Sequence, residues 1–137
     1  MPRVLGGRGE CIHISDIDGI VEYGNHPLAT IPFTTGDDID AKIAKTIVQQ
    51  IPDGATLQLG IGSLPNTIGA LLAESDLKDL GVHTEMLVDA FRLMYEHGQL
   101  TNRRKTFCRD KISWAFAWGR RTSMTGWTTT PSWQLIR

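Results

Sequence analysis

Two glycines, Gly60 and Gly62, interrupt an apolar stretch that reads LQLGIGSLPNTIGALL over residues 57–72. A glycine leaves room for a ligand to come within hydrogen-bonding distance of the peptide N–H groups. A helix that begins just after such a turn adds N–H donors and a partial positive charge, which suits a phosphate or an oxyanion. The local pattern alone favours a simple structural turn, because it lacks the third glycine of the dinucleotide fingerprint and the Gly-Lys-Ser/Thr of a P-loop.

A second candidate pair, His83 and Glu85, is two residues apart, so on a strand both side chains would lie on one face. Such a pair is more often a structural hydrogen bond than a catalytic site. A basic cluster follows, which could contact phosphate groups but is more commonly a solvated surface. Its members are Arg103, Arg104, Lys105, Arg109 and Lys111. Asn102, just before the cluster, is expected to hold a turn.

The cysteines and the isolated histidines suggest no metal site. Cys11 and Cys108 lack metal-ligand spacing and are too few for a disulfide framework, so we expect free thiols in a reducing cytoplasm. Cys108 has no base at a recognisable spacing and is not a convincing nucleophile. His13 and His26 have no partners at ligand spacing.

The overall composition is that of one soluble domain. The chain has 137 residues, of which 41% are hydrophobic and 21% charged, and these values argue against wholesale disorder. Its net charge of -1 argues against a nucleic-acid binder, which needs a surplus of Lys and Arg. No apolar run approaches the length of a membrane span, and MPRVLGGRGE has no signal-peptide core.

Helical and strand patterns on both sides would position the glycine turn. DDIDAKIAKTIVQQI predicts a helix that Asp37 or Asp38 caps and that ends at the PDG turn, residues 52–54. Its isoleucines recur every four residues, at Ile39, Ile43, Ile47 and Ile51. Alternating apolar residues then predict a strand over 55–62, and a spacing of three and four predicts a helix over 65–74.

The helix after the glycines has suitable residues at its start, since Ser63 can cap it and Pro65 costs no intrahelical bond. Further strands are expected near 11–15, 19–23 and 82–85. The last of these precedes a helix that Gly98 would stop and that would carry Leu87, Phe91 and Met94. Helix, strand, helix, strand, helix is the pattern of an α/β unit with a mostly parallel sheet flanked by helices, in which ligands bind beyond the C-terminal ends of the strands.

Three blocks in order, DGATLQLGIGSLPNTIGALL, LGVHTEMLVDAF and HGQLTNRRKT, resemble the acetyl-CoA hydrolase/transferase family, which includes acetate, butyrate and 4-hydroxybutyrate CoA-transferases. The upstream IHISDIDGIVEY is similar to the family segment that precedes the glycine turn. The resemblance covers residues 1–119 and implies a partial CoA-transferase-type domain, the start of the C-terminal half of a two-domain α/β protein. Full-length relatives are expected to be homo-oligomers in the cytoplasm.

The resemblance also implies a covalent mechanism, in which a glutamate attacks an acyl-CoA thioester and a glutamyl-CoA intermediate then activates a short carboxylic acid. Each transfer passes through a tetrahedral oxyanion, which backbone N–H donors can stabilise. Gly60, Ile61 and Gly62, with Pro65 and Asn66 fixing the turn, are therefore expected to face the thioester or CoA. Coenzyme A and acyl-CoA would be substrates, and no permanently bound cofactor is expected.

The family's nucleophilic glutamate lies downstream of TNRRKT, outside this chain, so Glu85 is only a weak substitute and no catalytic residue is assigned. The chain alone is expected to be inactive, and the strands left unpaired by truncation should make it aggregation-prone. Two other functions remain open. One is an acetyl-CoA hydrolase, and the other is a non-catalytic α/β module that binds a nucleotide-like ligand or a partner protein through the glycine turn.

The tail GRRTSMTGWTTTPSWQLIR lacks the apolar period of a helix or strand. Relatives would continue after FAxG with a sequence close to Lys-Glu-Leu-Tyr-Asp-Trp-Met-Asp-Asp-Asn-Pro. Shifted codons of this tail permit Tyr-Asp-Trp-Met-Asp-Asp-Asn-Pro in order, which indicates a frameshift near residues 118–121. Residues 120–137 are then expected to be poorly ordered or loosely packed. The alternative is an unusual but genuine tail, and resequencing the gene distinguishes the two.

Overall fold

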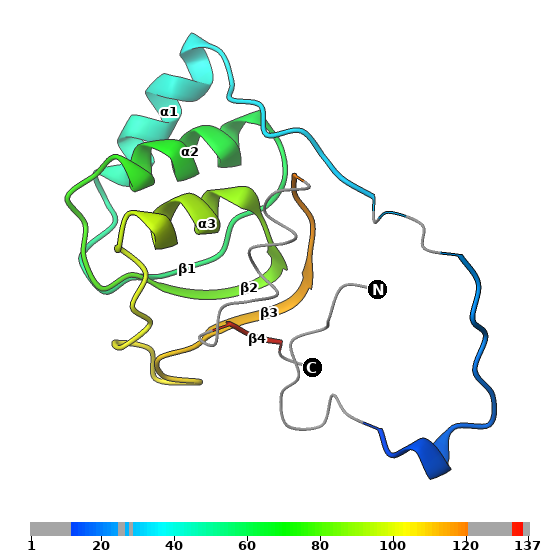
Figure 1. Ribbon diagram of the computed structural model, residues 1–137. Coiled ribbons are helices and arrows are strands. Elements are labelled where there is room, and N and C mark those ends of the chain that lie inside the picture. The colour runs from blue at the N-terminus through cyan, green and yellow to red at the C-terminus, as the bar shows by residue number, and fades with distance from the viewer. Residues whose placement is uncertain (1–11, 25–26, 28, 121–132, 136–137) are drawn as a thin grey trace.

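Parallel strands form one sheet in the order β1-β2-β3-β4, with helices packed against it (Figure 1). The computed structural model describes residues 12–24, 27, 29–120 and 133–135. The strands are β1 (Thr56–Leu57), β2 (Gly81–Leu87), β3 (Ile112–Ala117) and β4 (Trp133–Leu135). The helices are α1 (Asp38–Val48), α2 (Ser63–Ala73) and α3 (Asp89–Glu96), preceded by the 3-10 turn η1 (Ile14–Asp16).

The first helix, α1, begins as the sequence predicts, because Asp37 caps it. The Asp37 carboxylate accepts hydrogen bonds from the backbone N–H groups of Ile39, at 2.9 Å, and Asp40, at 3.0 Å. The helix ends at Val48, one turn earlier than expected. Pro52 explains the early end, since a proline disfavours the helical conformation in the residue before it.

The strand before the glycines is much shorter than the predicted 55–62, because only Thr56 and Leu57 pair with β2. The helix after them, α2, starts at Ser63 rather than Pro65. Its cap is Gly62, with no side-chain hydrogen bond, so the expected capping role of Ser63 is wrong. The sequence thus predicted the existence of both elements and misplaced their ends.

The second half of the fold follows the expected alternation. The predicted strand near 82–85 is β2, and the helix after it is α3, although Leu87 belongs to the strand. Gly98 ends α3 with φ of 76° and donates its N–H to the carbonyl of Tyr95 at 2.9 Å. This is the left-handed C-terminal stop that only glycine adopts without cost.

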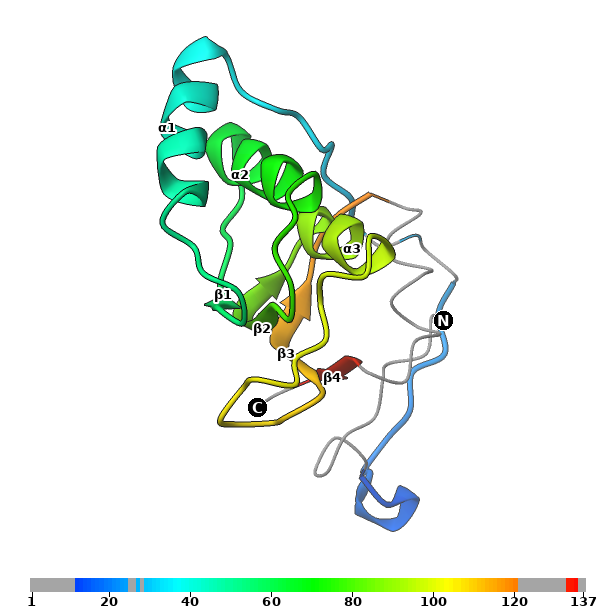
Figure 2. The same cartoon turned by 90° about the vertical axis from the view of Figure 1, so that its left-hand side faces the viewer.

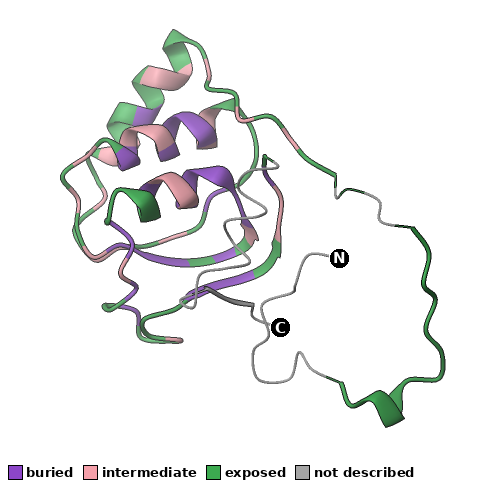
Figure 3. Cartoon of the chain, in the orientation of Figure 1, coloured by how far each residue is buried: buried purple, intermediate pink, exposed green. Residues whose placement is uncertain are grey.

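Helices α2 and α3 connect successive parallel strands and lie on the same face of the sheet (Figures 1 and 2). Two right-handed crossovers that add strands in one direction produce this arrangement. The core lies between the helices and the strands (Figure 3). Its fully buried members include Leu72, Leu80, Val82, Phe91, Met94 and Ile112. The predicted α/β fold with a parallel sheet and flanking helices is confirmed.

Two expected strands are absent from the described part of the N-terminal region. In place of a strand at 11–15 the chain forms η1, and residues 19–23 have no regular secondary structure. Strand β3 was not predicted, and neither was β4, which lies inside the suspected frameshifted tail. The tail segments 121–132 and 136–137 are outside the described residues, so the expected loose packing stays a prediction.

Candidate functional site

The glycine turn lies between β1 and α2 and is open to solvent from Gly60 to Ser63. Gly62 has φ of 125° and ψ of 175°, a backbone conformation that essentially only glycine adopts. It places the chain directly at the start of α2, where the first N–H groups have no partner inside the helix. The turn therefore offers donors and the positive end of a helix dipole toward the outside.

The two glycines of the turn have different structural explanations. A Cβ atom added to Gly60 would meet no atom within 4 Å, and one added to Gly62 would approach only Pro65, at 3.8 Å. Gly62 is explained by its positive φ. Packing inside the described chain does not explain Gly60, whereas the approach of a ligand to its backbone would.

A preceding segment holds the start of α2 in place through two buried side chains. Asn66 donates its side-chain N–H to the carbonyl of Thr34 at 2.9 Å. The Thr67 hydroxyl accepts the N–H of Gly36 and donates to the carbonyl of Ser63, both at 2.8 Å. Asn66 and Thr67 thus fasten residues 34–36 across the first turn of α2, beside the glycines.

Residues 34–36 are here called the strap. Asp89, which sequence reasoning missed, lies close to it. It is 3% exposed at the start of α3 and accepts the Arg120 side-chain N–H at 2.9 Å and the Arg120 backbone N–H at 3.1 Å. The Arg120 guanidinium also covers the Phe33 ring, 5.5 Å from its centroid. A small cavity is lined by Phe33, Asn66, Asp89 and Trp118 among others, so the starts of α2 and α3 meet there. The only feature of the sequence that pointed to Asp89 was the block LVDAF, in which it lies.

The pair His83 and Glu85 does share one face of β2, as alternation predicts, because both are exposed on either side of the buried Thr84. The His83 ring lies 5.9 Å from that of Phe107. These contacts give Glu85 no catalytic partner among the described residues.

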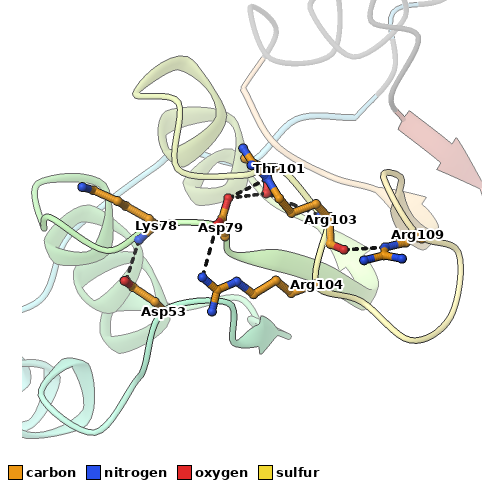
Figure 4. Close-up of polar contacts among 7 residues, drawn as sticks. All are labelled: Asp53, Lys78, Asp79, Thr101, Arg103, Arg104 and Arg109. Carbon is orange, nitrogen blue, oxygen red and sulfur yellow. Dashed lines mark hydrogen bonds and ion pairs between the residues drawn. The ribbon is translucent and has the colours of Figure 1, made fainter.

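Three arginines of the basic cluster, Arg103, Arg104 and Arg109, make contacts within the fold (Figure 4). Asp79 binds Arg103 at 2.8 Å and Arg104 at 3.4 Å, and accepts the Thr101 hydroxyl at 3.0 Å. Arg109 donates instead to the backbone carbonyl of Arg103 at 2.7 Å. Asp79 lies just before the start of β2, and Thr101 directly follows Leu100, which forms an isolated bridge with Leu80. This cluster therefore lies at the opposite end of the strands from the glycine turn.

Lys105 is buried, and its ammonium group donates three hydrogen bonds. The acceptors are the carbonyls of Val82 and Lys111, both at 2.7 Å, and the Ser113 hydroxyl at 2.8 Å. Burial lowers the pKa of Lys105, and its interaction with Cys108 opposes this in part. Because all three donors are used inside the fold, Lys105 ties β2 to β3 and is not available to a phosphate.

Asn102 holds a turn, as expected, with φ of 57° and a side-chain oxygen that accepts the N–H of Val82 at 2.9 Å. His13 accepts the N–H of Ser15 in η1 at 3.2 Å. Cys11 and His26 lie outside the described residues. In the part of the chain that the structure describes, no three His, Cys, Asp or Glu side chains form a metal-binding group, and no helix has the length and apolar character to span a membrane.

No protein-family model matches the chain. The chain is 52% identical over 120 residues to the butyryl-CoA:acetate CoA-transferase of Anaerostipes caccae. The aligned region makes up 87% of this chain and 27% of that protein. The solved 4-hydroxybutyrate CoA-transferase of Porphyromonas gingivalis superposes with a TM-score of 0.79 at 31% identity, over 91% of this chain and 31% of that one.

A solved mutant of RipA also superposes, with a TM-score of 0.88 at 36% identity, over 98% of this chain and 30% of that chain. The chain spans about 27% of the length of the Anaerostipes caccae enzyme. These matches confirm the resemblance found in the sequence: the chain is homologous to one part of the CoA-transferases.

Proposed function

We propose that this homologue of one part of the CoA-transferases contributes the acyl-CoA-facing glycine turn of an enzyme that moves CoA between an acyl-CoA and a short-chain carboxylic acid. The observation that carries the proposal is the open space around Gly60, where a Cβ atom would meet no atom of the described residues within 4 Å other than those of its chain neighbours. The homology to CoA-transferases supports the nature of the ligand. Acetate or butyrate metabolism in the cytoplasm fits this role, and so does assembly as a homo-oligomer.

The chemistry follows from the exposed N–H groups at the start of α2. Attack on a thioester carbonyl creates a tetrahedral oxyanion, and preorganised backbone donors in a site shielded from water stabilise that charge. Gly60, Ile61 and Gly62 are exposed and lead directly into α2, so their backbone can approach such an oxygen. Pro65 and the Asn66 hydrogen bond would keep the turn in position.

The covalent step of the proposal requires a glutamate that this chain does not supply. A carboxylate attacks the thioester, the C–S bond breaks, and CoA leaves as the thiolate. The product of this step is an acyl-glutamyl anhydride. The CoA thiolate then attacks the glutamyl carbonyl, the anhydride C–O bond breaks, the first carboxylate leaves, and a glutamyl-CoA thioester remains. A second carboxylate repeats the two steps in reverse, forming a new anhydride with loss of the CoA thiolate, which then attacks the new acyl carbonyl and releases the glutamate. We place this glutamate in polypeptide that corresponds to the rest of the relatives, so the chain alone is expected to show no transfer.

The test uses a chimera in which the 120 matched residues of this chain replace the corresponding segment of the Anaerostipes caccae enzyme. The chimera should transfer CoA from butyryl-CoA to acetate, and Gly60→Val should lower kcat/KM at least about 100-fold, comparable with removing an oxyanion donor. Gly60→Ala should have a smaller effect. An active Gly60→Val chimera would refute the role of the turn.

Gly60 is a better test position than Gly62. A side chain at Gly62 would be strained at φ of 125° and cost about 1–3 kcal/mol, so lost activity could reflect lost folding. At Gly60 the space is open, and we expect the thermal midpoint of Gly60→Val to stay within about 2 °C of the parent chimera. A large fall in that midpoint together with lost transfer would show a structural turn instead.

A further inference from the structure

Residues 12–24, here called the apolar arm, carry large apolar side chains that the fold leaves exposed. These are Ile12, Ile14, Ile17, Ile20, Val21 and Tyr23, with Val21 91% exposed and Tyr23 83% exposed. Two views at right angles show the arm running away from the sheet and helices (Figures 1 and 2). An exposed group of apolar residues of this kind is typical of an interaction site.

The composition of the arm does not fit a solvated linker. Segments that stay unfolded in solution are poor in aliphatic and aromatic residues, whereas six of the thirteen residues here are large and apolar. The charged residues of the arm are Asp16, Asp18 and Glu22, with no Lys or Arg. A partner surface should therefore be apolar with basic residues at its rim.

The structural match supports one occupant for the surface of the arm. The RipA chain covers 98% of this chain, so nearly all of the arm has a counterpart there, but this region is only 30% of the RipA chain. The arm therefore has an aligned counterpart in a protein in which much more polypeptide is present. The arm extends away from its own sheet, so that additional polypeptide is the surface on which it can rest.

We propose that the apolar arm docks on the polypeptide that corresponds to the remainder of a CoA-transferase-type subunit. Burying the apolar side chains there would remove them from water and so favour docking. The proposal rests on the relation to these proteins and not on the chemistry of the glycine turn, so the two can fail separately.

The test compares amide hydrogen exchange of residues 12–24 in the isolated chain and in the full-length chimera defined above. Exchange should be at least tenfold slower in the chimera. Replacing both Ile20 and Val21 with Asp in the chimera should restore fast exchange in the arm. The matched control is Ile39→Asp on α1, another isoleucine more than half exposed, which should leave the arm protected. Gly60→Val should also leave it protected, whatever it does to transfer.

Equal exchange of the arm in both proteins would overturn the proposal. So would protection in the isolated chain that rises with its concentration, because a second copy would then be the occupant. Loss of protection by Ile39→Asp as strongly as by the arm variant would show a general loosening instead of docking. If the chimera does not fold, exchange of the corresponding segment in the Anaerostipes caccae enzyme itself decides, with fast exchange as the contradicting result.

Discussion

Lys105 shows how one side chain can couple the stability of the sheet to pH. Its ammonium group is buried among two carbonyls and a hydroxyl, none of which carries a negative charge. Burial therefore lowers the pKa of Lys105 below its ordinary value of 10.5, although Cys108 opposes this in part. In the window between the lowered and the ordinary pKa the unfolded chain binds more protons than the folded one, so stability rises with pH there.

We predict that the contribution of Lys105 to the free energy of unfolding becomes more favourable as the pH rises toward 10.5. Urea unfolding between pH 7 and 10.5 measures this slope, which should be more positive in the parent chain than in Lys105→Met. Lys111→Met, at an exposed lysine, should keep the parental slope. Equal slopes in the parent and Lys105→Met would contradict the prediction.

Residue patterns predicted the position of the glycine turn but not which groups hold it. Gly60 and Gly62 could be singled out because glycine allows backbone conformations and close approaches that other residues do not. The bonds of Asn66 and Thr67 join residues more than 30 positions apart, and the sequence contains no signal for such pairs. Asp89 and the burial of Lys105 were missed for the same reason, since both depend on how distant segments meet in the folded chain.

At the scale of elements, α2 is held at its start by the strap of residues 34–36. The Thr67 hydroxyl bonds to both elements: it accepts the N–H of Gly36 in the strap and donates to the carbonyl of Ser63 in α2. Because Thr67 is buried, a methyl in place of its hydroxyl would leave the Gly36 N–H without that acceptor.

We predict that Thr67→Val lowers the free energy of unfolding by about 1–3 kcal/mol and speeds amide exchange in residues 34–36. Thr67→Ser keeps the hydroxyl and should lose less than about 1 kcal/mol. Chemical denaturation and exchange mass spectrometry measure the two effects. Destabilisation of Thr67→Ser as large as that of Thr67→Val would show that the methyl group, and not the hydrogen bonds, matters.

Elements with strong periodicity were predictable, and those defined by pairing were not. The cap at Asp37 and the apolar spacing in α2 are local signals, and both helices formed. The expected strand 55–62 was shortened because pairing with β2 stops at Leu57. The apolar residues of the arm predicted strands by propensity, yet a strand needs a neighbour, and the described part of the sheet offers none there.

For the whole molecule, the chain includes one layer of helices on one face of a parallel sheet (Figure 2). Parallel sheets are normally covered on both faces, so a chain homologous to about 27% of a CoA-transferase is expected to rely on further polypeptide. The exposed arm and the open glycine turn fit this view, because both present surface that is accessible to solvent in the described part of the chain.

Removing the tail tests whether it is genuine, because a selected strand β4 and a frameshifted tail predict different changes in the free energy of unfolding. If residues 120–137 result from a shifted reading frame, they were not selected to pack, and removal of residues 121–137 should change the free energy of unfolding by less than about 1 kcal/mol. If the tail is genuine, its removal exposes the edge of β3, where Ile112, Ser113 and Trp114 pair with β4, and should cost more. We predict the small change for a chain that ends at Arg120, which keeps the contacts of that residue with Asp89. Urea unfolding of this shortened chain beside the parent measures the difference, and a loss above about 2 kcal/mol would establish β4 as a selected strand and remove the physical case for a frameshift.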